Sequence, residues 1–134
     1  MSYESNITAA DHLFAGEDKT LSYEVFAAGS TTVMENVAGF TLQWEMRKAG
    51  SSKDPLRDQG PSVVSKTTAS GITITGVYNS ARAVNTQRVL VAIADTDTEA
   101  LTGGRYVCAL KRMDPGLEAV LGHGTVELLV AAVR

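Results

Sequence analysis

The fold is decided by one stretch of the sequence, residues 40–47, which read FTLQWEMR. Apolar and polar residues alternate here, so that Leu42, Trp44 and Met46 fall on one face of an extended chain. This period of two is typical of a strand with one face in the core and the other in water. We therefore expect a β-strand over residues 40–47, with Trp44 in the core.

The same alternation recurs along the chain between glycine-rich turns, which predicts an all-β fold of about 7–9 strands. Further strands are expected at residues 21–25, 63–64, 72–75, 88–93, 105–111, 117–121 and 125–133. Two hairpins follow from the turn signals: one joins 63–64 to 72–75 through residues 68–71, and one turns at Pro115-Gly116. A β-turn is the expected role of Gly122 and Gly124.

Two segments do not read as strands. Residues 48–61 are poor in apolar side chains and contain two prolines, which predicts a long exposed loop. Residues 95–101 read as one short helical turn, with Asp95 at its N-cap.

The N-terminal residues 1–18 are polar and irregular, and we expect them to form an arm preceding a sandwich domain at 19–134. Such a segment has too few apolar groups to offset its ordering entropy, so Ile7, Leu13 and Phe14 are candidate contacts with another subunit. The strand expected at 125–133 is apolar on both faces, which predicts that the arm or a partner covers it.

Composition excludes several functional classes. The 134 residues include 12 Lys and Arg against 15 Asp and Glu, a net charge of −3, and the basic residues are scattered, so we expect no nucleic-acid binding. No apolar run approaches the roughly 20 residues of a membrane span, and residues 1–6 lack the charge pattern of a secretory leader. The lone Cys108 agrees with folding in a reducing cytoplasm.

The candidates for chemistry have simpler interpretations. His12 and His123 each lack a second metal ligand at a suitable spacing. Asp95, Asp97 and Glu99 alternate like the start of a calcium-binding loop, but the glycine and distal glutamate of such a loop are absent, so the start of a helix explains them better. Cys108 shares a strand face with Tyr106 and reads as a small buried apolar residue rather than a nucleophile. We expect no catalytic residue, no cofactor and no metal site, and hence no enzymatic activity.

Trp44 and the string Gly104-x-Tyr106-x-Cys108 resemble two landmarks of immunoglobulin-like domains, the tryptophan of an early strand and the tyrosine corner before a buried cysteine. The resemblance implies an immunoglobulin-like antiparallel β-sandwich with Trp44, Tyr106 and Cys108 in its core. The partner cysteine is missing, because Tyr23 and Val25 stand where it would lie. The two sheets should therefore be held by packing alone.

A second resemblance, to the small β-sandwich modules of tailed bacteriophages, covers roughly residues 15–132. It is carried by five short motifs at residues 15–21 (AGEDKTL), 36–40 (NVAGF), 70–74 (SGITI), 95–97 (DTD) and 101–106 (LTGGRY). The order is similar to that of the N-terminal domain of upper baseplate proteins, although Val37-Ala38-Gly39 stands where that family has Leu-Thr-Gly.

That resemblance implies a non-enzymatic structural protein of the virion, made in the bacterial host cytoplasm. Its partners would be tail, neck, fibre or major capsid proteins, with further copies of itself in a homo-oligomer. Two roles remain open, an adaptor at the tail, baseplate, neck or fibre and a decoration protein on the capsid. A third alternative, a module binding host-surface carbohydrate, would call for exposed aromatic side chains, and aromatic residues make up only 6% of the chain.

Overall fold

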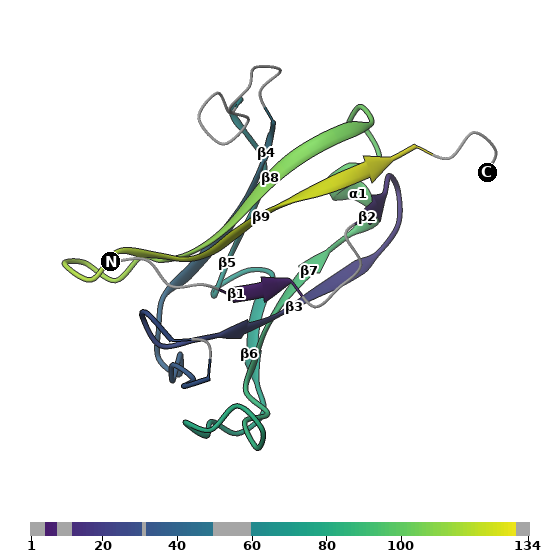
Figure 1. Ribbon diagram of the computed structural model, residues 1–134. Helices are drawn as coiled ribbons and strands as arrows, with labels where there is room; N and C mark the ends of the chain where they lie inside the picture. Colours follow the sequence, from purple (N-terminus) through teal and green to yellow (C-terminus); the bar gives the residue numbers. More distant parts are fainter. Residues whose placement is uncertain (1–4, 8–11, 31, 50–59, 131–134) are drawn as a thin grey trace.

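Two β-sheets face each other across an apolar core in the computed structural model (Figure 1). The structure describes residues 5–7, 12–30, 32–49 and 60–130, with the backbone alone described at 5–7 and 12–14. The predicted all-β sandwich with very little helix is confirmed.

Each sheet mixes strands from distant parts of the sequence. The four-stranded sheet has the order β1 (Ser5–Ile7), β3 (Lys19–Val25), β7 (Arg88–Ile93) and β6 (Ile72–Thr75). The five-stranded sheet has the order β2 (His12–Phe14), β9 (Ala119–Leu129), β8 (Gly104–Arg112), β4 (Leu42–Lys48) and β5 (Ser62–Thr67). β2 runs parallel to β9, and the other neighbouring strands pair antiparallel.

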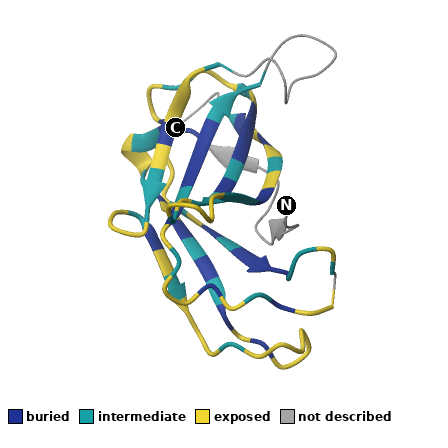
Figure 2. Cartoon of the chain, turned by 90° about the vertical axis from the view of Figure 1, so that its left-hand side faces the viewer, coloured by how far each residue is buried: buried dark blue, intermediate teal, exposed yellow. Residues whose placement is uncertain are grey.

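The core lies between the sheets and follows the alternation of the sequence. Leu42, Trp44 and Met46 of β4 are fully buried, and β8 contributes Cys108 and Leu110 from the same face of its sheet. Figure 2 shows buried residues along the strands of both sheets and exposed residues mainly in the loops. A buried large side chain contributes about 1.5–3 kcal/mol relative to an exposed one, so this face is the main source of stability.

A buried hydrogen bond joins the two sheets. The Trp44 Nε1–H donates to the Tyr23 hydroxyl oxygen at 2.8 Å, and this bond joins β4 of one sheet to β3 of the other. Burial raises the pKa of Tyr23, and the neighbouring Cys108 raises it further. Cys108 is a free, buried thiol. No disulfide links the sheets, which are held by packing and by this hydrogen bond.

Tyr106 has the geometry of a tyrosine corner. Its side chain is buried, and its hydroxyl donates to the carbonyl oxygen of Thr102 at 2.7 Å, four residues upstream. The Lys48 Nζ lies 4.8 Å from the centre of the ring. The hydroxyl thus satisfies a backbone carbonyl at the turn that leads into β8.

The short helical turn is present as α1 (Asp95–Thr98), but its cap differs from the prediction. Ala94, not Asp95, occupies the N-cap, and the Asp97 carboxylate accepts a hydrogen bond from the Ala94 amide at 2.7 Å. Asp97 also forms an ion pair with Lys66 of β5 at 2.7 Å. One carboxylate therefore caps the helix and connects it to the five-stranded sheet.

The hairpin at Pro115-Gly116 is present as β8 and β9, but the β-turn predicted at Gly122 and Gly124 and the hairpin predicted from residues 63–64 and 72–75 are wrong. Gly122 and Gly124 lie inside the single strand β9, where they pair with Leu110 and Cys108 of β8, and a register shift follows between Leu110 and Lys111. β5 and β6 do not form a hairpin: after the turn at residues 68–71, β5 stays with β4 and β6 pairs with β7 of the other sheet.

The N-terminal segment differs from the predicted arm of residues 1–18 at two places. Residues 5–7 pair with 25–23 in β3, and residues 12–14 pair in parallel with 127–129 in β9. Backbone pairing at a sheet edge needs no particular side chain, so the polar composition of the segment did not reveal these strands. β2 pairs with one edge of β9, and the predicted cover of the outer face of residues 125–133 stays a prediction.

The candidate subunit contacts lie in these two edge strands. Ile7 ends β1, and Leu13 and Phe14 belong to β2. Their side chains lie outside the described part of the chain, so their contact role stays a prediction. Residues 1–4 and 8–11 of the predicted arm and most of the predicted loop at 48–61 also fall outside it, whereas residues 15–18 are described and lead into β3.

Candidate functional site

The three loops at one end of the sandwich form the candidate site, which we call the loop end: residues 26–41, 76–87 and 113–118. They join β3 to β4, β6 to β7 and β8 to β9. The pairing of Leu42 with Arg112 and of Thr75 with Arg88 brings the ends of these strands together. Figure 1 shows the three loops at the lower and left side of the molecule.

The first two loops are tied to each other by backbone and side-chain hydrogen bonds. The Met34 amide donates to the Ser80 carbonyl at 2.9 Å, and the Tyr78 hydroxyl donates to the Met34 carbonyl at 3.0 Å. The buried Gln87 side chain accepts from the Val37 amide at 3.1 Å and donates to the Asn36 side chain at 3.1 Å. Loops that are held together in this way lose less conformational entropy when they bind a partner.

The third loop is tied to the end of the first. The Asp114 carboxylate accepts from the Thr41 amide at 3.1 Å and from the Arg112 Nε–H at 2.8 Å. The Arg112 guanidinium lies 3.7 Å from the centre of the Phe40 ring. The hydrogen bond from Arg112 is the main cause that lowers the pKa of Asp114, so this acid is ionised at neutral pH.

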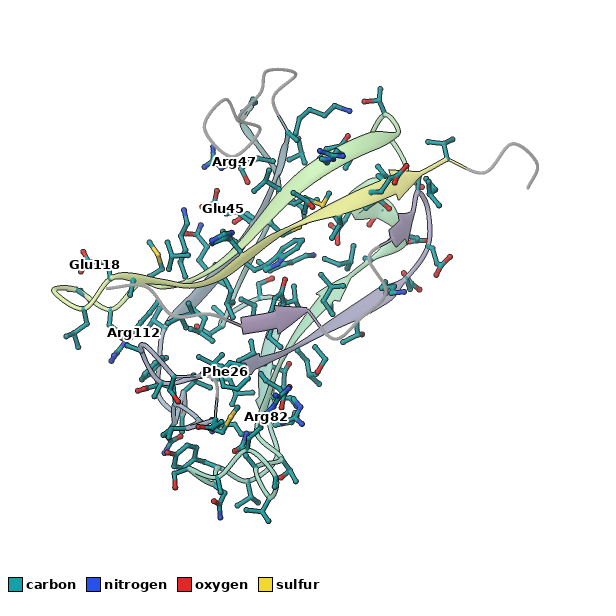
Figure 3. The ribbon with its side chains drawn as sticks, in the orientation of Figure 1. Phe26, Glu45, Arg47, Arg82, Arg112 and Glu118 are labelled. Carbon is teal, nitrogen blue, oxygen red and sulfur yellow. The ribbon has the colours of Figure 1, made fainter. Side chains whose placement is uncertain are left out.

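A buried acid anchors the middle loop to the four-stranded sheet. Glu24 of β3 is 6% exposed and is paired with Arg82 at 3.1 Å and with Arg88 at 3.4 Å. The Arg82 guanidinium also lies 5.1 Å from the centre of the Phe26 ring. Figure 3 labels both residues in the lower part of the view. Because Glu24 is already compensated, these groups fix the loop and are not poised for acid–base chemistry.

Large apolar side chains are exposed on this rigid support. Among the described residues, five of the seven exposed large apolar side chains lie at the loop end: Val33, Val77, Val84, Met113 and Leu117. Val77 is 74% exposed and Val84 is 61% exposed, in the same loop. Single exposed apolar residues are ordinary, but their concentration on preordered loops is typical of a protein-binding surface.

A shallow groove of about 330 Å³ lies on the outer face of the five-stranded sheet. Val107, Ala109 and Val120 line it together with charged groups of β4, β8 and β9. Glu45 is paired with Arg47 at 2.6 Å and lies 3.8 Å from the Lys111 Nζ (Figure 3). Since the Glu45 carboxylate is already paired with Arg47, what remains for a ligand in this groove is mainly a small apolar surface.

The core residues predicted from the sequence are buried and line neither surface. Trp44, Tyr106 and Cys108 are at most 2% exposed, and burial raises the pKa of the Cys108 thiol to about 12. A thiol with so high a pKa stays protonated at neutral pH and is a poor nucleophile. These residues hold the sandwich together and do not form a surface site.

The sequence did not reveal the loop end, although a signal was present. Val33, Val77 and Val84 stand in stretches rich in glycine, serine, threonine and asparagine, outside any alternating run. An apolar residue in such a stretch has no strand face to bury it, and this exposure could have been anticipated. Their gathering at one end depends on the pairing of the strands and is visible only in the structure.

Other kinds of site find no support in the described residues. No group of three or more His, Cys, Asp and Glu side chains in that part of the chain could hold a metal ion. None of its helices has the length and apolar character required to cross a membrane. No protein-family model matches the chain, and no curated protein matches it at a significant level.

Proposed function

We propose that this protein is a non-enzymatic structural component of a tailed-phage virion, which binds neighbouring virion proteins through its loop end. The observation that carries the proposal is the loop end itself, where rigid loops present exposed valines and no reactive group. Surfaces of this kind bind proteins through apolar contacts and pre-ordered backbone.

The strand order supports an immunoglobulin-like sandwich. In a constant-type domain the first, second, fifth and fourth of seven strands form one sheet, and the third, sixth and seventh form the other. If β2 and β5 are treated as added edge strands, the remaining seven have this arrangement, β1-β3-β7-β6 and β4-β8-β9. The hydrogen bond from Tyr106 to Thr102 supports the same assignment.

Three of the five motifs that resemble phage baseplate modules coincide with structural junctions. The first leads into β3 through a turn at Gly16, and the second contains Gly39, whose positive φ of 81° suits glycine, just before β4. The last contains the tyrosine corner. This coincidence supports the resemblance, because motifs at chain reversals reflect the geometry that a family shares.

The inert buried groups support a non-enzymatic role. Cys108 is a protonated thiol, and the buried acid Glu24 is neutralised by two arginines. Of the aromatic side chains in the described part of the chain, Trp44, Tyr23, Tyr106 and Phe26 are buried and Phe40 and Tyr78 are partly buried, which disfavours the alternative of a carbohydrate-binding module that stacks sugars on exposed rings.

Localisation on intact particles tests the proposal and separates its two roles. Antibodies against the protein should label virions in electron micrographs. Labelling at the tail, neck or baseplate supports the adaptor, whereas labelling over the whole shell supports capsid decoration. Virions that carry none of the protein would overturn both.

A paired substitution tests the loop end. Val84→Asp replaces an exposed apolar side chain, so the free energy of unfolding should change by less than about 0.5 kcal/mol while incorporation into particles falls. Val63→Asp, on β5 and 37% exposed, is the matched control and should be incorporated normally. Equal incorporation of both variants would rule out the loop end as the docking surface.

A further inference from the structure

The hairpin that joins β8 to β9 ends in an exposed tip, residues 113–118. Leu117 is a large apolar side chain and is nevertheless 57% exposed. Glu118, the next residue, is also exposed and forms no ion pair with the described residues. The other acid of the tip, Asp114, is already paired with Arg112 at 2.8 Å. The tip therefore offers an apolar group beside one uncompensated carboxylate.

The groove on the outer face of the five-stranded sheet has the complementary character. Its apolar floor is formed by Val107, Ala109 and Val120. The Glu45 carboxylate accepts a hydrogen bond from the Arg47 guanidinium at 2.6 Å, and the Lys111 Nζ lies 3.8 Å from the same carboxylate. Two cations thus share one anion, so the groove carries an apolar floor beside one positive charge in excess.

Tip and groove are neighbours on the same side of one hairpin. Lys111 and Val120 both line the groove and form one pair of the β8–β9 ladder, and Glu118 stands two residues before Val120. Residues two apart in an extended chain face the same side. Figure 3 agrees, because it labels Glu118 above the ribbon, as it does Glu45 and Arg47 at the groove. The free carboxylate and the surplus cation therefore lie close together on the outer face.

We propose that two copies of this chain pack the outer faces of their β8–β9 hairpins together in antiparallel orientation, so that each tip covers the groove of the other copy. Leu117 rests on the apolar floor of the partner, and Glu118 pairs with Lys111 of the partner subunit. A two-fold axis midway between Lys111 and Glu118 exchanges their positions, so both contacts form twice. The contact is isologous and closes as a dimer. It extends the proposed function, because the tip belongs to the loop end, but it requires no other virion protein.

The charge pattern favours a second copy over a partner of uniform charge. The hairpin presents an anion at its tip and a surplus cation in its groove, and such a pattern is complementary to itself when it is turned by a two-fold axis. A nucleic acid would satisfy the groove but would be repelled by the tip, and a uniformly basic protein would do the reverse. The apolar group beside each charge meets an apolar group in the same arrangement.

Sedimentation of the purified chain over a concentration series tests the dimer. The average mass should rise toward twice that of the monomer. Glu118→Lys sets an ammonium group against Lys111 of the partner subunit and should weaken self-association about tenfold or more. Glu17→Lys makes the same change of charge at an exposed glutamate between β2 and β3, outside the hairpin. This matched control should dimerise like the unaltered chain.

A charge exchange identifies the pair that meets across the axis. Lys111→Glu alone should also stay monomeric, because it faces Glu118 of the partner subunit. An equal mixture of Glu118→Lys and Lys111→Glu chains should form heterodimers, since opposite charges then meet again at both contacts. Two variants that remain monomeric when they are mixed would show that these residues do not face each other, and would overturn the proposed contact.

Two further variants separate this dimer from the proposed docking to virion proteins. Leu117→Ser leaves every charge in place and should weaken the dimer, because it removes the apolar group that rests on the floor of the groove. Val84→Asp lies in a different loop and should dimerise normally even where its incorporation into particles is lost. A monomer at every concentration, or a dimer that Glu118→Lys and Leu117→Ser both leave intact, would overturn the dimer without bearing on the virion role.

Discussion

Trp44 links the two sheets both by its volume and by its indole N–H. It is the largest fully buried side chain, and its N–H is satisfied by Tyr23 of the opposite sheet. A buried aromatic residue with a satisfied polar group combines apolar transfer with a directional bond. The alternation of apolar and polar residues around Trp44 predicted its burial. The hydrogen bond to Tyr23 could not be predicted, because it depends on how the two sheets pack against each other and not on the spacing of residues along the chain.

Replacing Trp44 with alanine should lower the free energy of unfolding by about 3–5 kcal/mol, because the change loses transfer energy and leaves a cavity. Chemical denaturation of both proteins measures the difference. Indole fluorescence of the unaltered protein should be that of a buried ring. Emission typical of a water-exposed indole, or an alanine variant as stable as the parent, would contradict the burial of this side chain.

Tyr106→Phe should keep the fold and cost roughly 0.5–1.5 kcal/mol of stability, since it removes one hydrogen bond and leaves the Thr102 carbonyl to be solvated. Denaturant midpoints provide the measurement. Tyr78→Phe, which also removes a single hydroxyl-to-carbonyl bond, is a useful comparison in a half-exposed setting. If Tyr106→Phe is neutral, the corner hydroxyl contributes nothing to the turn before β8.

The strands were predictable where the local sequence pattern alone determines them. They were less predictable where their position depends on which other strand they pair with. β4 alternates so strictly that its strand and its inward face follow from the sequence. β9 was divided at Gly122 and Gly124 because glycines usually mark turns, yet both are held in the ladder by β8. β5 and β6 were joined because their turn is local, but their partners lie in different sheets.

α1 is the element whose stability should depend most clearly on pH. Burial alone would raise the pKa of Asp97, but hydrogen bonds from Lys66 and the Ala94 amide, with the charge of Lys66, lower it overall. A lowered pKa means that the ionised carboxylate stabilises the folded state. This contribution is present above the ordinary value of 3.8 and is lost as the pH falls through the lower folded-state value.

Asp97→Asn should therefore destabilise the protein at neutral pH and have little effect in strong acid. Asparagine can still accept from the Ala94 amide, so the variant isolates the ion pair from the cap. Denaturant midpoints measured from pH 7 downward should converge for the two proteins. Asp95→Asn, at an exposed position, is the control; a constant difference at every pH would show that the charge of Asp97 is not the cause.

At the scale of the whole molecule, the sandwich class was predictable but its surfaces were not. The alternation of apolar and polar residues between turns specifies strands with one apolar face. A sheet of such strands needs a second layer to bury that face. The loop end is assembled from three loops that span 84 positions from Val33 to Leu117, and it exists only once the strands pair. The edge strands β1 and β2 were not predicted for the same reason, because they form only by backbone hydrogen bonding to β3 and β9.

Hydrogen exchange of the isolated chain should protect backbone amides of residues 12–14, because the chain is anchored directly after the pairing of β2 with β9. Directly after β2, the Ala15 amide donates to the Leu129 carbonyl at 2.9 Å and the Gly16 amide donates to the Thr98 hydroxyl at 3.1 Å. Ala15 itself is buried. A three-residue strand held at its exit in this way opens with the sheet edge instead of fraying as a free end. Exchange as fast as in an unfolded peptide would show that β2 leaves the edge of β9 open, and the segment would then be an arm available to a neighbouring subunit.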